Sequence, residues 1–183
     1  MSIKRLSTWL VLFTALLFTA SCKQGDIEQT QEGEADMAIQ LTSKAFKEGE
    51  SIPKQYTCDG KNTSPQLAWT GTPGVAKSFA LIMDDPDAPG GTFVHWVLFD
   101  LPAEMTELAE GYQGLGSPGS NSYRKQAYNG PCPPPGAAHR YYFKLYALDT
   151  NLKLPTGATK ADVEKAMQGH ILAWGQLMGK YRR

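Results

Sequence analysis

Three short apolar runs, separated by turn-forming stretches, constrain the fold of this chain more than any other feature. The runs are SFALIM at Ser78–Met83, VHWVLFDL at Val94–Leu101 and YYFKLYAL at Tyr141–Leu148. Apolar and aromatic runs of this length are typical of strands in the interior of a sheet. Stretches such as TGTPG, DAPGG and NGPCPPPG lie between them and favour turns. We therefore predict a mainly β domain with an antiparallel sheet, and further short strands at Ile39–Thr42 and Leu67–Trp69.

The C-terminal part follows a helical period. Apolar residues recur at helical spacing across Thr159–Lys180, and Thr159 with Asp162 resembles a capping box in which Asp replaces Glu. Three glycines in this segment either let a helix approach the sheet closely or break it in two. The sequence predicts a C-terminal helix and a second, shorter one near Pro102–Leu108. The apolar positions are Val163, Met167, Ile171, Trp174, Leu177, Met178 and Tyr181, and the glycines are Gly169, Gly175 and Gly179.

The charge balance of the chain argues against a nucleic-acid partner. Lys and Arg together number 18, as do Asp and Glu, so the formal net charge of the 183 residues is zero. Nucleic-acid-binding domains usually carry a marked basic surface. We therefore expect any anion to be bound by local groups rather than by the field of the whole protein. The cysteine spacing matches no metal site. Two His and two Asp residues could hold a metal, but their type and spacing are unspecific, and we expect neither a metal nor a cofactor.

The N-terminal 22 residues have the layout of a secretory signal. The basic start MSIKR is followed by WLVLFTALLFTA, an uncharged run too short for a comfortable membrane span. Small residues then precede Cys22, as in the bacterial lipobox, although Thr19 stands where Leu is usual. We predict a lipoprotein-type signal peptide at 1–21 and a lipidated Cys22. The alternatives are a plain signal peptide cut nearby and an uncut N-terminal anchor.

The next residues read as a tether to a single folded domain. Residues 22–36 are polar, acidic and almost free of bulky apolar side chains, so they cannot bury enough surface to become ordered. We predict a flexible tether at 22–36 and a domain at 37–183. The predicted location is that of an exported bacterial lipoprotein, in the periplasm or at the surface of an envelope membrane.

Two cysteines of the predicted domain stand in turn-rich stretches, Cys58 in YTCDGKN and Cys132 in YNGPCPPPG. An oxidising compartment permits a disulfide between them. The alternative is two unpaired thiols in separate loops. We regard the Cys58–Cys132 bridge as the leading hypothesis.

Two of the three histidines stand where a turn-rich loop enters a strand. His95 follows DDPDAPGGTFV, and His139 precedes YYFKLYAL. If the two strands are neighbours, both imidazoles converge with Asp85 or Asp87 at one end of the sheet. A carboxylate that accepts from an imidazole fixes its tautomer and raises its basicity. The third histidine, His170, is expected to be a packed or surface residue on the C-terminal helix.

The motifs DPDAP, HW, PPPG and HRYYFKLYALD resemble the phosphatidylethanolamine-binding protein family, the group that includes Raf kinase inhibitor proteins, and most closely its bacterial branch. The resemblance extends from Leu41 into the C-terminal segment. It implies a central antiparallel sheet packed on a smaller sheet, with terminal helices. It also implies a small pocket for phosphate, phosphorylated head groups and similar anions. By resemblance the pocket is lined by Asp85, Asp87, His95, Gly130, Cys132, His139 and Tyr141.

Several of these residues have a simpler structural interpretation. Asp84 reads as a solvated turn carboxylate, and Asp87 as either a turn cap or a ligand contact. For Arg140 an ion pair with the DPDAP carboxylates is favoured over ligand contact. Tyr141 could belong to the core. The backbone N–H groups of Gly130 and Cys132 are candidate anion donors.

The function expected from these features is non-catalytic binding of a small phosphate-type anion or phospholipid head group by a membrane-tethered protein. One alternative is inhibition of an envelope protease or another enzyme. Another is weak hydrolysis by a His/Asp pair, although no G-x-S-x-G nucleophile motif is present. The sequence leaves the oligomeric state open.

Overall fold

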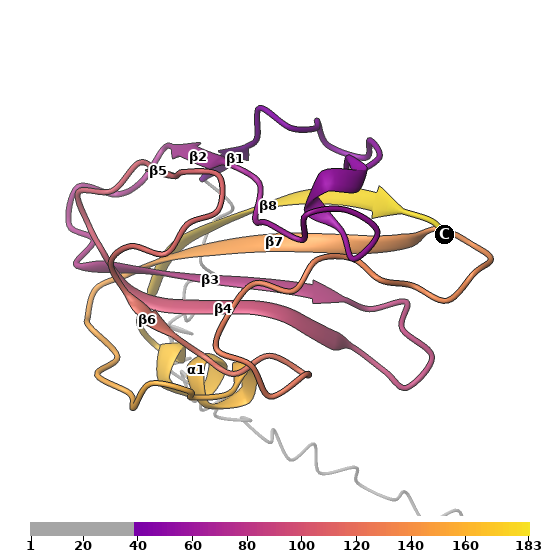
Figure 1. Cartoon of the computed structure of the whole chain (residues 1–183). Coiled ribbons are helices and arrows are strands. Elements are labelled where there is room, and N and C mark those ends of the chain that lie inside the picture. Colours follow the sequence, from indigo (N-terminus) through magenta and orange to yellow (C-terminus); the bar gives the residue numbers. More distant parts are fainter. Residues whose placement is uncertain (1–38) are drawn as a thin grey trace, which may run out of the picture. The chain divides into compact units, whose positions relative to one another are not determined.

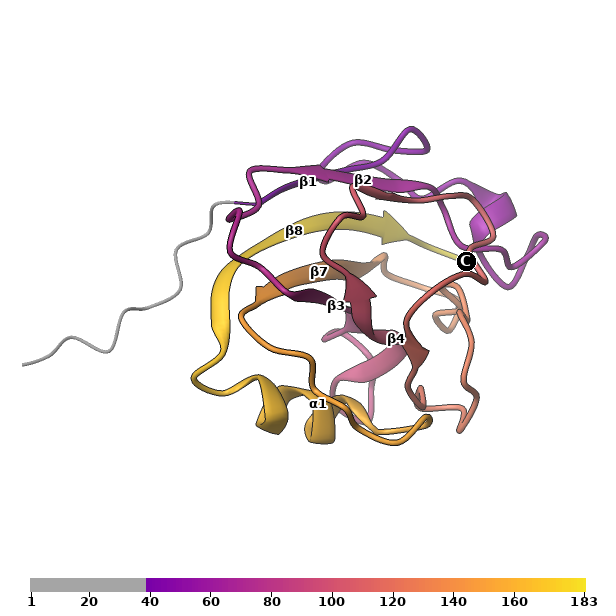
Figure 2. The ribbon, with the colours of Figure 1, turned by 90° about the vertical axis from the view of Figure 1, so that its left-hand side faces the viewer.

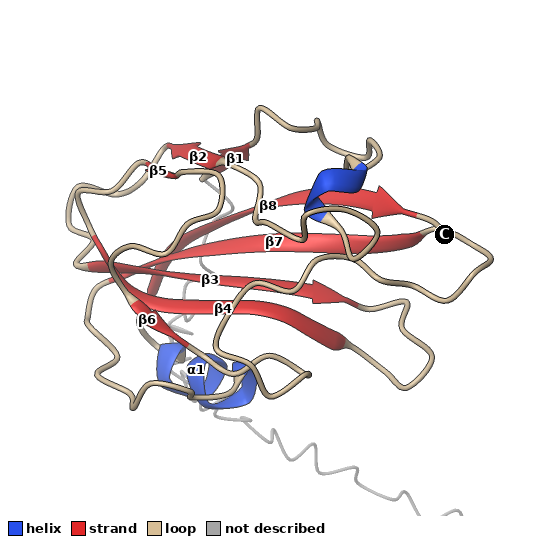
Figure 3. Cartoon of the chain, viewed as in Figure 1, coloured by secondary structure: helices blue, strands red, loops and turns tan. Residues whose placement is uncertain are grey.

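The computed structural model describes residues 39–183 (Figure 1). The predicted signal peptide (1–21), the predicted tether (22–36) and Cys22 lie outside the described residues. In chain order the elements are β1 (Gln40–Thr42), the 3-10 turn η1 (Lys54–Tyr56), β2 (Leu67–Thr70), β3 (Ser78–Asp85), β4 (Phe93–Pro102), β5 (Glu107–Leu108), β6 (Ser117–Pro118), β7 (His139–Leu148), α1 (Lys160–Met167) and β8 (Ile171–Tyr181). Figure 3 shows how strands dominate these elements, as predicted.

The central sheet has five antiparallel strands in the order β6-β4-β3-β7-β8. Its three inner strands are the three apolar runs of the sequence, extended by a few residues at their ends. All eight residues of β3 are buried, because both faces of this strand are covered. An apolar run without alternation is the pattern that such a strand requires.

A smaller antiparallel sheet, in the order β1-β2-β5, covers one face of the central sheet (Figures 1 and 2). Side chains from the facing sides of both sheets form one buried core, in which Trp69 of β2 meets Phe79 of β3 edge to face with ring centroids 5.5 Å apart. The predicted strands at Ile39–Thr42 and Leu67–Trp69 are confirmed as β1 and β2. The fold is therefore the predicted central antiparallel sheet packed on a smaller one.

Helix α1 covers the opposite face of the central sheet (Figure 2). Val163 and Met167 of α1 pack into a second core that includes Ile82 of β3 and Phe99 of β4. The helix begins with the predicted capping box, in which Thr159 and Asp162 bond reciprocally. Across residues 39–183, no helix combines the length and the apolar composition that crossing a bilayer requires.

The predicted helix at Thr159–Lys180 is wrong beyond Met167. Gly169, at φ +75°, lies in the turn that follows α1, and the chain then forms the long strand β8. Burial alternates along β8, with Ala173, Gly175, Leu177 and Gly179 buried. The apolar positions of this segment fit both a helical and a strand period. Gly175 and Gly179, an even number of residues apart and therefore on one face of a strand, were the missed signal.

The glycines of β8 make room for the N-terminal segment of the domain. A Cβ on Gly175 would collide with the carbonyl of Ile39, and one on Gly179 would collide with Ile52 and Phe46. The same segment bonds to the outer edge of β8: Ile39 N–H donates to the Trp174 carbonyl, and Gly49 N–H donates to the Met178 carbonyl. Residues 39–52 therefore cover an edge of the central sheet.

The predicted helix near Pro102–Leu108 is also wrong. A single turn, in which Met105 N–H donates to the Pro102 carbonyl, leads into the two-residue strand β5. Leu108 is fully buried opposite Leu67 of β2. Pairing with the small sheet overrides the local helical preference.

Cys58 and Cys132 form a disulfide across a sequence separation of 74 residues. Cys58 N–H also donates to the carbonyl of Pro131, at 3.1 Å. The bridge thus joins the loop after η1 to the proline-rich loop before β7.

The disulfide should contribute measurably to stability, because it closes a long loop in the unfolded chain. We expect the double variant Cys58→Ser/Cys132→Ser to lose about 2–4 kcal/mol of unfolding free energy, measured by chemical denaturation. Reductant should lower the denaturation midpoint of the wild type toward that of the double variant, and should leave the midpoint of the variant unchanged. A wild-type midpoint that is insensitive to reductant would contradict this expectation.

Candidate functional site

A cavity of about 140 Å³ lies where β3 ends and β4 and β7 begin. These ends meet because the three strands are antiparallel neighbours. The structure brings together five of the seven predicted pocket residues here. The lining residues are Asp85, Ala88, Pro89, Phe93, His95, Tyr123, Cys132, Pro133, Pro134, His139 and Tyr141.

Asp85 and His139 form a buried pair in the wall of the cavity. His139 Nδ1 lies 2.8 Å from Asp85 Oδ2, and the other carboxylate oxygen accepts from the backbone N–H of Asp87 at 2.8 Å. Both oxygens of Asp85 are therefore engaged by protein donors. The contact at Nδ1 fixes the imidazole ring and leaves Nε2 of His139 as the nitrogen that can meet a ligand.

A register shift directs His95 to this face of the sheet. Met83 lies opposite Trp96, but Asp84 lies opposite Val94, so His95 is the extra residue of a bulge in β4. A bulge of this kind re-aims a side chain next to a functional site. The sequence did not reveal it, because β4 is apolar nearly throughout.

His95 is held by a backbone carbonyl. Its Nδ1 lies 2.7 Å from the carbonyl oxygen of Asn129. A carbonyl only accepts, so Nδ1 carries the proton and Nε2 is unprotonated in the neutral ring. Burial lowers the pKa of His95 from its ordinary value of 6.5, because the low-dielectric surroundings disfavour the charged form. Protonation at Nε2 would turn that atom from an acceptor into a donor.

Tyr141 contributes a hydroxyl that makes no hydrogen bond of good geometry within residues 39–183, although the Asp85 carboxylate lies close enough to act on it. The side chain is fully buried, and its ring meets His95 edge to face with centroids 5.3 Å apart. Burial and, after it, the Asp85 carboxylate raise the pKa of Tyr141. The hydroxyl is therefore a protonated donor at neutral pH, in the wall of the cavity. A buried polar group without a well-placed partner calls for an explanation.

Asp87 does not line the cavity and instead pairs with Arg140. Its carboxylate accepts from Nη2 of Arg140 at 2.6 Å and from Nε at 2.9 Å, and also accepts from the backbone N–H of Arg140. This contact lowers the pKa of Asp87 to about 2. Asp87 therefore ties the loop after β3 to the start of β7, a role distinct from the turn cap and the ligand contact weighed for it, and the ion pair favoured for Arg140 is present.

Gly130 does not line the cavity, although its backbone lies beside His95. Its N–H donates to Oδ1 of Asn62 at 2.7 Å, so this donor is already engaged. A Cβ at this position would collide with the carbonyl of Tyr56. Close packing of two loops explains the glycine. Cys132 lines the cavity, and its sulfur is part of the disulfide.

The expectation that Asp84 is a solvated turn carboxylate is wrong. Asp84 is 1% exposed and accepts from Nζ of Lys144 at 2.9 Å and from Nζ of Lys160 at 2.6 Å. Consecutive strand residues point to opposite faces, so Asp84 turns toward α1 and Asp85 toward the cavity. His170, predicted on a helix, lies in the turn before β8 and contacts Asp149.

Sequence reasoning missed the apolar part of the cavity wall. Phe93 packs against both His95 and Tyr123, with ring centroids 5.1 and 4.9 Å apart. In the sequence Phe93 stands two residues before His95, and this proximity was the only local indication that Phe93 would line the cavity. Across residues 39–183, no group of three or more His, Cys, Asp or Glu side chains is arranged to hold a metal ion.

Comparison with known proteins finds relatives that match most of the chain. The sequence model of the family described as "phosphatidylethanolamine-binding protein" matches residues 42–182. The chain belongs to the phosphatidylethanolamine-binding protein family. A UPF0098 protein of Methanothermobacter thermautotrophicus is 50% identical over 151 residues, covering 79% of this chain and 99% of the relative.

Two solved structures of the family share the fold. A crystal structure of a phosphatidylethanolamine-binding protein homologue from Chlamydia trachomatis superposes with a TM-score of 0.77 at 44% identity, covering 80% of this chain and 98% of the other. The crystal structure of E. coli YbcL, which is described as a new member of the mammalian family, gives a TM-score of 0.74 at 32% identity. The match covers 80% of this chain and 99% of YbcL. Both the predicted family and the predicted fold are thereby confirmed.

Proposed function

We propose that the cavity of about 140 Å³ binds a small phosphate-type anion, either free or as a phospholipid head group, without transforming it. The observation that carries the proposal is the buried Tyr141 hydroxyl, which makes no hydrogen bond of good geometry within residues 39–183, although the Asp85 carboxylate lies close enough to act on it. An oxyanion in the cavity would supply a well-placed acceptor. Family membership supports the same class of ligand.

The charges around the cavity are compatible with an anion despite the presence of Asp85. Both Asp85 oxygens already accept hydrogen bonds, from Asp87 N–H and from His139. The carboxylate therefore orients His139, while the side-chain groups left for the ligand are the Tyr141 hydroxyl and the Nε2 atoms of the two imidazoles. A hydrogen bond to a charged group contributes about 1.5–3 kcal/mol.

The size and lining of the cavity favour binding of one small group without catalysis. Its volume lies below the roughly 300–1,000 Å³ typical of sites for drug-sized ligands, so a head group fits better than a whole lipid. The described lining includes no serine or threonine hydroxyl, and the Cys132 sulfur is held in the disulfide. The described lining therefore offers no free serine, threonine or cysteine as a nucleophile.

Removing the Tyr141 hydroxyl should separate binding from stability. We expect Tyr141→Phe to weaken phosphate or phosphorylethanolamine binding about tenfold by calorimetry, because one charge-assisted hydrogen bond is lost. The unfolding free energy should stay equal or rise by up to about 1 kcal/mol, because a buried donor without a well-placed partner is removed. Tyr142→Phe on the same strand is the matched control.

Two results would count against the proposal. One is unchanged anion affinity in a well-folded Tyr141→Phe variant. The other is release of inorganic phosphate from phosphorylethanolamine by the wild type, lost in His139→Ala, which would indicate catalysis.

The affinity for an oxyanion should depend on pH through His95. Only the protonated ring offers a donor at Nε2, and its pKa is below 6.5. Sulfate is a suitable probe because it stays dianionic from neutral to mildly acidic pH. We expect sulfate affinity to rise by up to about tenfold per unit as pH falls from 8, and to level off below the His95 pKa. His95→Gln should flatten the profile, and an affinity that stays constant from pH 5 to 8 in the wild type would contradict it.

The proposal includes a location outside the cytoplasm, with the chain held to a membrane through a lipidated Cys22. It is supported by the lipobox-like sequence before Cys22 and by the Cys58–Cys132 disulfide, which suits an oxidising compartment. We expect radiolabelled palmitate to be incorporated on bacterial expression and to be lost in Cys22→Ser. Cys22→Ser should also move the protein from the membrane to the soluble fraction, and equal labelling of both would refute the anchor.

A further inference from the structure

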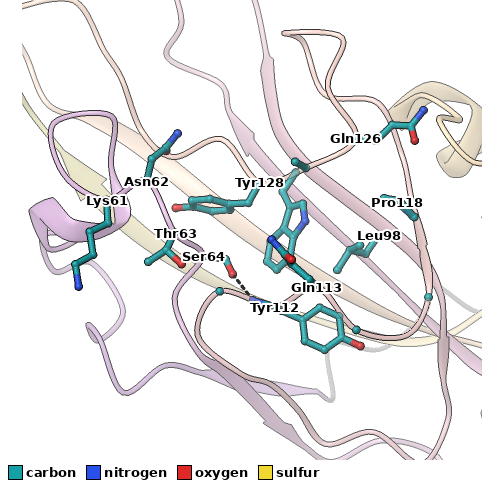
Figure 4. Close-up of a pocket in the computed structure, with 15 residues that line it drawn as sticks. Lys61, Asn62, Thr63, Ser64, Leu98, Tyr112, Gln113, Pro118, Gln126 and Tyr128 are labelled. Carbon is teal, nitrogen blue, oxygen red and sulfur yellow. Dashed lines mark hydrogen bonds between the residues drawn. The ribbon is translucent and has the colours of Figure 1, made fainter.

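A second and larger cavity, of about 440 Å³, shares no lining residue with the first (Figure 4). Its walls come from residues 61–64, from β4 and β6, from the loop 111–116 and from residues 126–128. Its volume lies within the roughly 300–1,000 Å³ of typical small-molecule sites. Trp96 lines this cavity, whereas its chain neighbour His95 lines the first.

The lining of the larger cavity combines apolar walls with uncharged polar groups. Apolar surface comes from Trp96, Leu98 and Pro118, with the rings of Tyr112 and Tyr128. The polar groups are hydroxyls and amides, and none of the described lining residues is acidic. Lys61 is the one charged member of this described lining, and Figure 4 shows its amino group pointing away from the other labelled side chains. Lys61 therefore marks the rim, and the interior lacks negative charge.

Trp96 and Ser64 each add a side-chain donor to this lining. Trp96 is 2% exposed and lines the cavity, and its indole N–H can donate but not accept. Ser64 Oγ accepts from the N–H of Tyr112 at 3.1 Å, the contact dashed in Figure 4. The hydroxyl hydrogen of Ser64 remains free to donate.

We propose that this cavity is a second ligand site, selective for a small organic carboxylate with an apolar or aromatic body. The body would contact Leu98, Pro118 and the tyrosine rings. The carboxylate would accept from the Trp96 indole N–H and the Ser64 hydroxyl. Lys61 at the rim favours an anion, and an ammonium ligand would find no carboxylate to pair with. Inorganic phosphate has no apolar body and belongs to the smaller cavity.

Three probes with the same aromatic body test this selectivity: phenylacetate, phenylacetamide and 2-phenylethylammonium. NMR of the ¹⁵N-labelled full chain follows the indole N–H signal of Trp96, with that of the buried Trp69 as an internal reference. We expect phenylacetate to shift the Trp96 signal saturably and to bind at least about fivefold more tightly than the amide. The ammonium probe should give no saturable shift, and saturating sulfate should not displace phenylacetate.

Variants at the rim and in the wall complete the test. Lys61→Gln should weaken phenylacetate binding about threefold or more, while Lys77→Gln, an exposed lysine that lines neither cavity, should not. Trp96→Phe should weaken phenylacetate binding at least fivefold. Trp96 is a core residue, so this variant could misfold. In that case the Lys61→Gln variant still decides the test, because Lys61 is exposed and its replacement should not disturb the fold. The proposal is overturned if no probe shifts Trp96, if the ammonium binds as well as the carboxylate, or if sulfate or His139→Ala abolishes phenylacetate binding.

Discussion

The structure depends on the burial of two adjacent carboxylates at the end of β3. A strand covered on both faces cannot end in acidic residues unless each charge finds partners, because an unpaired buried charge is strongly destabilising. Asp84 is held by Lys144 of β7 and Lys160 of α1, and Asp85 by His139 of β7 and the turn N–H of Asp87. The same two residues thus join the helix layer to the sheet and set the geometry of the smaller cavity.

Much of the fold could be predicted because the central strands have a local signature. β3, β4 and β7 are short apolar runs between turn residues, and their pattern does not depend on distant contacts. β8 differs, because its apolar positions fit a helix as well as a strand. The choice was made by long-range packing: Gly175 and Gly179 let Ile39 and Ile52 lie against the strand.

The candidate site was predicted in composition but not in detail. Histidines at two strand entries, beside an acidic turn, indicated a cluster that includes Asp85, and the cluster is present. The bulge at His95 could not be predicted from the sequence, because a nearly continuous apolar run does not indicate where a strand contains an extra residue. The ion pair of Arg140 with a DPDAP carboxylate was predicted and is present at Asp87, whereas the contact between Gly130 N–H and the Asn62 side chain was hidden, since it forms only once the two loops pack together. Sequence shows which groups are available, whereas their three-dimensional partners decide which remain free for a ligand.

The N-terminal segment that bonds along β8 has a consequence for self-association. An exposed sheet edge offers unpaired N–H and C=O groups that another chain can extend, which is a common route to aggregation. Here Ile39, Gly49 and Ile52 donate to carbonyls of β8, and Lys180 N–H donates back to Glu50. These backbone groups are already taken, and the glycines beneath keep the covering segment close. A strand from a second molecule could pair with β8 here only after residues 39–52 had dissociated from it. In the folded protein these residues therefore prevent another chain from extending the sheet at this edge.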